Sequence, residues 1–223
     1  MRPELYNHLD PAVVGNDMRI LVTEMAGRAS IELKGRELGV DLAGQGDAIG
    51  RVVDQVKVLE ADGWSFEAAD ASFELLLRAQ LPDPPPPLFE LESYRTSVEH
   101  WGNGVVVSEA TVKVHLVNAD GTRERVISTG EGNGPVNALD NALRQALVSR
   151  YPQLADVSLA DYKVRILGWK GGTSATTRVL VDTTDGVREW TTVGVHANIV
   201  EASWHALVDA LTFAVVRHPS SAG

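Results

Sequence analysis

The chain has 223 residues, of which 44% are hydrophobic and 22% charged, with a net charge of −10 and no cysteine. The acidic balance argues against a nucleic-acid partner, and the lack of cysteine excludes disulfides and thiolate zinc sites. No apolar run approaches the roughly 18 residues of a membrane span, and residues 1–10 lack the apolar core of a signal peptide. We therefore expect a cytoplasmic protein with no membrane partner.

The first 81 residues predict a small, mainly helical region. Glycines punctuate residues 1–44, which predict short segments that need another surface to pack against. Apolar residues recur at helical spacing over 49–59, and Gly63 closes that helix. Ser65 is the expected N-cap of a second helix, whose apolar face runs over 66–77. The two helices should form an αα-hairpin.

The sequence PDPPPP at 82–87 predicts an extended boundary between two parts of the chain. Consecutive prolines favour a stiff polyproline stretch and cannot lie inside a helix or sheet. About 80 residues precede this boundary and about 135 follow it.

After the boundary the pattern changes to strands. Val112, Val114 and Leu116 alternate with polar residues, which predicts a half-buried strand, and Val164 and Ile166 alternate in the same way. Asp-Gly pairs at 120–121 and 185–186 are typical of hairpin turns.

An internal repeat organises this second part. Residues 130–147 and 194–211 share seven identities in eighteen ungapped positions, at an offset of 64. Leu116-Val117 also matches Leu180-Val181 at this offset. Farther upstream the offset is 68, and the change predicts a longer loop around 102–108 in the first copy. The identical pairs are Gly130/Gly194, Val136/Val200, Ala138/Ala202, Ala142/Ala206, Leu143/Leu207, Ala146/Ala210 and Leu147/Leu211 at offset 64, and Leu91/Leu159, Tyr94/Tyr162 and Trp101/Trp169 at offset 68.

The repeat predicts an α+β fold, a duplicated β-β-β-α domain with pseudo-twofold symmetry that follows small helical subdomains. One three-stranded sheet with one helix buries too little apolar surface to be stable alone, so the two copies should pack together. A small ligand would bind where copies or subunits meet. The alternative is that the duplication only builds a core.

These motifs resemble the C-terminal regulatory region of citramalate synthase and 2-isopropylmalate synthase, members of a family that includes homocitrate synthase. The resemblance rests on SEATVKV, EGNGPVNALDNAL, LADYKVRIL, TSATTRVLVDT and WTTVGVHANIVEASWHALVDAL. YNHLDPAVVGNDMRILVTEMAGR and VLEADGWSFEAADASFELLLR resemble the two linker subdomains of the same enzymes. It implies linker subdomain I at 1–44, helical linker subdomain II at 45–81, the Pro-rich linker at 82–87 and the regulatory (allosteric, dimerisation) domain at 88–218.

The resemblance implies a function for the full enzyme that this chain does not carry alone. Such enzymes condense acetyl-CoA with a metal-bound 2-oxo acid in a TIM barrel, a fold of about 250 residues that cannot fit here. The implied partners are that barrel in cis, a second copy in a homodimer and a branched-chain amino acid. The motifs favour citramalate synthase, of isoleucine biosynthesis, and hence isoleucine; leucine and 2-isopropylmalate synthase are the alternative. No cofactor is expected in this chain, and a divalent metal only in the barrel.

The turn at 130–135 is the first candidate site. Its spacing matches no phosphate-binding motif, no lysine follows, and Glu131 would repel phosphate. Pro135 suits the first helical turn, whose free amides can receive an amino-acid carboxylate. By resemblance, the effector site comprises Asn133, Val136, Asn137, Leu159, Tyr162, Ile166, Thr173 and Thr177. Leu159 and Ile166 could instead be core residues, and Asn137 replaces an aspartate frequent in the family.

Two further candidates are weaker. By resemblance, Tyr6 assists the catalysis of a neighbouring subunit, and its alternative role is packing. His196 and His205 lack an evident carboxylate partner, so no metal site is expected. A regulatory module is the favoured function, against catalysis by the chain alone, which no nucleophile–base pair supports, and against a purely structural dimerisation scaffold.

Overall fold

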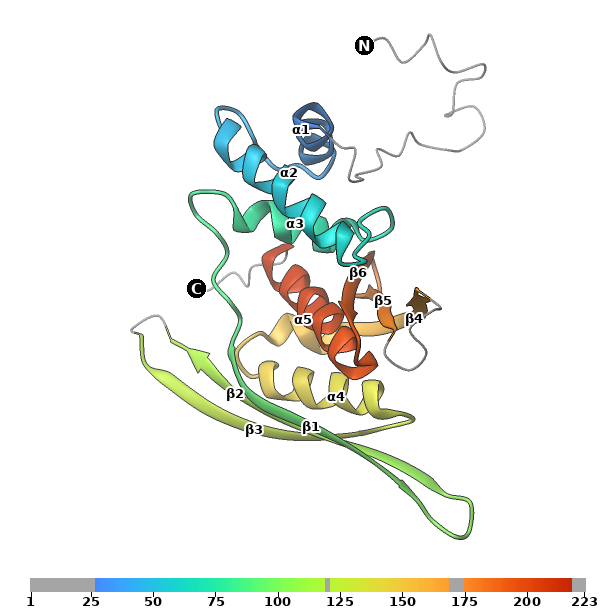
Figure 1. The fold of residues 1–223 in the computed structure, drawn as a ribbon. Coiled ribbons are helices and arrows are strands. Elements are labelled where there is room, and N and C mark those ends of the chain that lie inside the picture. The colour runs from blue at the N-terminus through green and yellow to red at the C-terminus, as the bar shows by residue number, and fades with distance from the viewer. Residues whose placement is uncertain (1–26, 119–120, 169–174, 218–223) are drawn as a thin grey trace.

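The structure is a computed structural model that describes residues 27–118, 121–168 and 175–217 (Figure 1). Three helices precede two three-stranded sheets, each followed by a helix, which confirms the predicted α+β class and the β-β-β-α order. Tyr6 and Thr173 lie outside the described residues. The elements are α1 Arg28–Glu37, α2 Gly46–Ala61, α3 Asp70–Ala79, β1 Glu90–His100, β2 Val106–Val117, β3 Arg123–Gly132, α4 Pro135–Leu147, the 3₁₀ helix η3 Pro152–Asp156, β4 Ser158–Leu167, β5 Thr176–Thr184, β6 Glu189–His196 and α5 Ile199–Arg217.

The three N-terminal helices share one small core. Ile31 of α1, Val52 of α2, and Phe73 and Leu77 of α3 are fully buried in it. α1 was not predicted, because Ile31 is its only buried large apolar residue. Its buried charge Lys34 instead pairs with Asp70 of α3 at 2.9 Å.

The predicted start of the second helix is wrong. α3 begins at Asp70 after the N-cap residue Ala69, and Ser65 lies outside the helix. Phe66 and Ala69 are buried, but they belong to a connection that follows Gly63, whose φ is +102°. Their apolar side chains extended the helical pattern, although the backbone there is not helical. Residues 80–89, with the proline run, carry neither helix nor strand.

The two sheets enclose a layer made by α4 and α5, which lie side by side (Figure 1). Both sheets are antiparallel and have the order of the chain. Buried Val112 and Val114 of one sheet and Val179 and Val181 of the other belong to one core. Trp204 of α5 joins the copies, because its ring stacks on Tyr94 and meets Phe89 edge-on at 5.9 Å. The copies therefore share a core.

The repeated glycines and alanines mark the closest contact between helix and sheet. A Cβ added to Gly130 would lie 2.5 Å from the Ala142 nitrogen and 2.7 Å from the Ala138 oxygen. At Gly194 an added Cβ would overlap the Ala202 oxygen, the matching contact of the second copy. The identities at offset 64 thus have a physical reason, since only glycine lets the helix backbone approach the strand so closely.

One part of the predicted repeat alignment is wrong. Tyr94 pairs with Val112 in the first sheet, and the matching Tyr162 pairs with Val181 in the second, so these strands correspond at an offset of 69. The match of Leu116-Val117 to Leu180-Val181 is fortuitous, because an odd slip reverses the faces of a strand. The extra residues of the first copy therefore lie in the β2–β3 hairpin and not around 102–108. Gly121 and Gly186, both at positive φ, form the predicted turns.

α5 corrects the expectation about apolar runs. It has 19 residues and, by length and composition alone, is apolar enough to cross a membrane, with a mean hydropathy of 1.5. Its Trp204, Leu207 and Leu211 are buried in the shared core, which accounts for this composition. The helix is therefore the central core helix of the fold.

Candidate functional site

The turn between β3 and α4 leaves a helix start without a side-chain cap. Gly134 is the N-cap residue and offers no side chain, and Pro135 occupies the first helical turn as predicted. The Asn133 N–H donates to Asn137 Oδ1 at 3.2 Å, so this side chain stabilises the turn. A Cβ on Gly132 would lie 2.5 Å from the Ala138 nitrogen, which explains the glycine there. The first N–H groups of α4 are those of Val136 and Asn137, because Pro135 has none, and no side chain caps this helix start.

The matching start of α5 is closed by its own side chain. Asn198, which corresponds to Gly134 at the repeat offset, accepts a hydrogen bond from the Val200 N–H at 2.8 Å through its Oδ1. Such capping satisfies one of the amides that a helix start leaves free. The two copies thus differ at the N-cap position, where the described side chains cap the start of α5 but not that of α4.

Three predicted residues share the face of the second sheet that carries α5. Tyr162 and Ile166 alternate along β4, and Thr177 of β5 pairs with Ile166. The Tyr162 hydroxyl is 2.8 Å from Ser203 Oγ, which itself donates to the Ile199 oxygen at 2.7 Å. Burial raises the pKa of Tyr162, so this residue stays a neutral hydrogen-bonding group.

β4 corrects one expectation about burial. Its Val164 and Ile166 are 42% and 67% exposed, so this strand is not half-buried as β2 is. Among the described residues, nothing covers Val164 and Ile166 fully on this side of the sheet. Ile166 is therefore not a core residue in the described chain, whereas Leu159 packs against the shared core. Which of the predicted residues contact an effector stays a prediction.

In the first sheet, too, the strands extend beyond the helix that packs against them. Figure 1 shows the β1–β2 hairpin extending beyond α4. Val98, which corresponds to Ile166 in the repeat, is 55% exposed on the helix-facing row, and Val106 and Trp101 at the hairpin end are 56% exposed each. Each copy thus presents uncovered apolar side chains next to a helix start.

The predicted residues form two groups. Asn133, Val136 and Asn137 lie in the β3–α4 turn, while Leu159, Tyr162, Ile166 and Thr177 lie on the second sheet. Val136, Leu159 and Tyr162 pack against one core. Within the described ranges no hydrogen bond joins the two groups. They meet through the helical layer, where α4 and α5 start at the same end (Figure 1).

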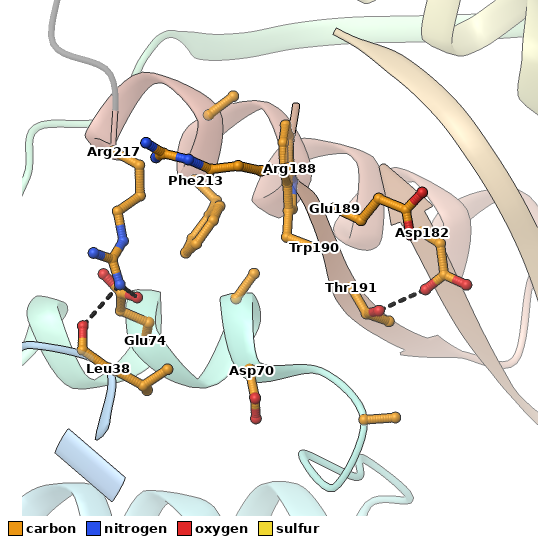
Figure 2. A pocket seen from close by; sticks show the side chains of 13 residues that line it. Leu38, Asp70, Glu74, Asp182, Arg188, Glu189, Trp190, Thr191, Phe213 and Arg217 are labelled. Carbon is orange, nitrogen blue, oxygen red and sulfur yellow. Dashed lines mark hydrogen bonds and ion pairs between the residues drawn. The ribbon is translucent and has the colours of Figure 1, made fainter. Parts of the chain in front are cut away.

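A cavity of about 530 Å³ between the N-terminal helices and the second sheet was not predicted. Figure 2 shows Arg217 of α5 reaching Glu74 of α3 and the Leu38 oxygen, to which it donates at 2.8 Å. The guanidinium lies 5.6 Å from the centroid of the Phe213 ring. With acidic and basic groups both in its lining, the cavity favours no single ligand class. Glu74 is fully buried beside this cavity, a property that the sequence does not reveal.

Charge on the outer face of the first sheet is arranged in surface pairs. Arg125 donates to Glu92 through Nε at 2.6 Å and Nη2 at 2.8 Å. This hydrogen bonding lowers the pKa of Glu92 to about 2.

On α5, His205 lies 3.4 Å from Glu201, a carboxylate partner that sequence reasoning missed. Among the described residues, no group of three or more His, Asp or Glu could hold a metal ion.

Comparisons with known proteins agree with this architecture. Residues 67–215 match the LeuA allosteric (dimerisation) domain. The chain is 56% identical over 215 residues to an (R)-citramalate synthase of Streptomyces coelicolor, and this match covers 96% of the chain and 39% of the relative. It is 45% identical to the (R)-citramalate synthase of Synechocystis and 40% identical to that of Aquifex aeolicus, over 95% of the chain in each case and 38% and 39% of the relatives. The chain thus spans about two fifths of the length of these relatives, and it belongs to the LeuA allosteric (dimerisation) domain family.

Proposed function

We propose that this chain is the C-terminal linker and regulatory region of a citramalate synthase. The full enzyme would convert acetyl-CoA, pyruvate and water to citramalate in isoleucine biosynthesis. The names of the relatives support this assignment. The condensation, and the divalent metal that serves it, would belong to a barrel outside this chain, so the chain alone would be inactive. The compartment would be the cytoplasm.

The proposed role of the chain is to bind a branched-chain amino acid, with isoleucine preferred, and to inhibit the barrel. One observation carries this proposal: the helix start at Gly134 is open, whereas the matching start at Asn198 is capped. An α-carboxylate can accept hydrogen bonds from the free amides of α4, where the helix dipole also favours negative charge. Apolar residues beside it, such as Val136, suit a branched aliphatic side chain.

The uncovered strand ends support association with a second copy. Val98, Trp101 and Ile166 are each more than half exposed, and all three are apolar. Burying such side chains between subunits contributes about 25 cal/mol per Å² of apolar surface, which favours an interface here. In a homodimer this interface would enclose the helix starts, so an effector would bind next to the partner subunit.

A binding experiment tests the effector proposal. Thermal unfolding and calorimetry would be measured with isoleucine, leucine, valine and acetyl-CoA, each added to the dimeric chain. We expect isoleucine alone to raise the Tm at millimolar concentration, through preferential binding to the folded state. Stabilisation by leucine alone would point to a 2-isopropylmalate synthase. No response to any of the four would leave only a structural dimerisation role.

A matched pair of variants tests the open helix start. Gly134→Asn gives α4 the side-chain cap that Asn198 gives α5, and an added Cβ at Gly134 meets nothing within 4 Å. This variant should keep its stability or gain slightly, since asparagine exceeds glycine at an N-cap by only about a few tenths of a kcal/mol, but should bind isoleucine at least about tenfold more weakly. The control Asn198→Gly should lower the Tm and leave affinity unchanged. Equal affinity in Gly134→Asn and the natural chain would refute the role of the amides.

Catalysis by the chain alone has a direct test. Citramalate formation from acetyl-CoA and pyruvate would be assayed with the chain and, separately, with the full enzyme. Product from the chain alone, at a rate comparable to that of the full enzyme, would overturn the assignment of the chemistry to the barrel.

A further inference from the structure

The N-terminal helices and the repeated domain meet along one surface of the second sheet. Val193 and Val195 of β6 are buried against the core of α1–α3. Polar contacts cross the same boundary, where Arg178 of β5 donates to the Gly63 oxygen at 2.6 Å and to the Trp64 oxygen at 3.3 Å. We call this boundary the helix–sheet joint. The joint is thus one place where the repeated domain and the N-terminal helices contact each other directly.

A half-buried carboxyl, that of Asp209, and a buried hydroxyl, that of Ser72, lie in the joint. Ser72 of α3, which is 3% exposed, donates from Oγ to Asp209 Oδ2 of α5 at 2.6 Å. Ser72 Oγ also accepts a hydrogen bond from the backbone N–H of Val193 at 3.0 Å. One serine hydroxyl therefore connects α3, α5 and β6, because its oxygen accepts from the Val193 amide while its proton is donated to the Asp209 carboxyl.

The described lining of the cavity beside Asp209 provides no cation. Asp209 lines this cavity of about 380 Å³ with apolar side chains such as Trp64 and Leu76, and no other ionisable group occurs among the described residues of that lining. Elsewhere on the packed elements, Glu74 of α3 pairs with arginines, and His205 of α5 stacks on Trp64 and lies near Glu201. α2 contributes Gln55 and β6 contributes Val193, neither of which titrates.

We propose that Asp209 and Ser72 make the helix–sheet joint proton-sensitive. The joint is stably closed while Asp209 is protonated, and it opens more readily once Asp209 ionises. A carboxylate held without a cation in an apolar cavity is destabilised relative to one in water, and a single hydroxyl donor offsets only part of this. When the joint opens, the ionised form regains its hydration. The proposal is independent of the effector and of the assignment to citramalate synthase.

Burial supports this direction, since it raises the pKa of Asp209 from its ordinary 3.8 to about 7, with the Ser72 hydrogen bond acting in the opposite sense. At any pH between these two pKa values, opening the joint releases a proton from the Asp209 carboxyl. Stability of the joint is fully present below about pH 4, falls as the pH rises towards 7 and is constant above that. The equilibrium constant for opening should rise by up to about tenfold per pH unit within this window.

Hydrogen exchange on the full chain tests the proposal. Exchange in α3 and at the Val193 amide, corrected for intrinsic rates, would be measured from pH 5 to 8 for the natural chain, for Asp209→Asn and for the control Asp54→Asn on the exposed face of α2. The neutral amide should remove the rise in opening with pH, and the control should keep it. Parallel profiles for Asp209→Asn and the natural chain would overturn the proposal.

A second measurement keeps the test decisive if Asp209→Asn does not fold. In the natural chain, the resonance of the Val193 amide should titrate together with the Asp209 carboxyl, with a midpoint near pH 7, because Ser72 bonds to both. A carboxyl that titrates near its ordinary value, or a Val193 resonance that ignores it, would overturn the joint as a proton-sensitive device.

Discussion

Replacing Gly194 by alanine should be among the most damaging single-methyl additions in the domain. The new Cβ would overlap the Ala202 oxygen and lie 2.8 Å from the Ala206 nitrogen, both in the backbone of α5. A rigid helix can relieve this only by moving away, by roughly 1 Å. The contacts of α5 with β5 and β6 would then lose a quarter to half of their energy, together about 2–4 kcal/mol.

Urea unfolding followed by far-ultraviolet circular dichroism measures this loss. Gly130→Ala, whose Cβ would lie 2.5 Å from the Ala142 nitrogen, should lose less, about 1–2 kcal/mol. The control Gly102→Ala meets nothing within 4 Å and should stay within about 0.5 kcal/mol of the natural chain. If Gly194→Ala were as stable as Gly102→Ala, the close approach of α5 to its sheet would be refuted.

Three further outcomes follow from described contacts. Ile166→Asp should raise the dissociation constant of the proposed dimer at least about tenfold in sedimentation experiments, whereas Val187→Asp, in a turn and 88% exposed, should not. Arg217→Gln should lower the free energy of unfolding by roughly 2–3 kcal/mol, less than the usual loss for a broken buried pair because Glu74 keeps its second arginine; a smaller loss than 1 kcal/mol would contradict this. Glu92, with a pKa of about 2, should remain ionised at pH 3 in a carboxyl NMR titration, and the stability it contributes above pH 4.5 should be lost progressively as the pH falls from 4.5 through about 2.

The parts of the fold that the sequence predicted are those set by local periodicity or by the repeat. Buried Val112, Val114 and Leu116 alternate as expected for a strand with one core face. Gly130 and Gly194 were visible as identities, and their cause is the helix backbone packed against them. Hydrophobic periodicity did not predict α1, because this helix is held by a tertiary contact of the buried Lys34 and not by an apolar face.

The candidate site was predictable only as two separate groups. The turn before α4 could be located because Pro135 and the glycines around it have local consequences. The exposure of Ile166 could not, because strand alternation does not reveal where the covering helix begins. Contacts between Ser72 and Asp209, which are 137 positions apart, leave no pattern in the sequence at all.

The core shared by the two copies is an interface that a single β-β-β-α unit could obtain only from another molecule. Joining the units through the connection that contains η3 makes this association intramolecular, so it does not depend on protein concentration. It also removes the constraint of identity that symmetry imposes on a true homodimer. Gly134 and Asn198 illustrate this freedom, because identical subunits could not hold one open and one self-capped helix start within the same pair.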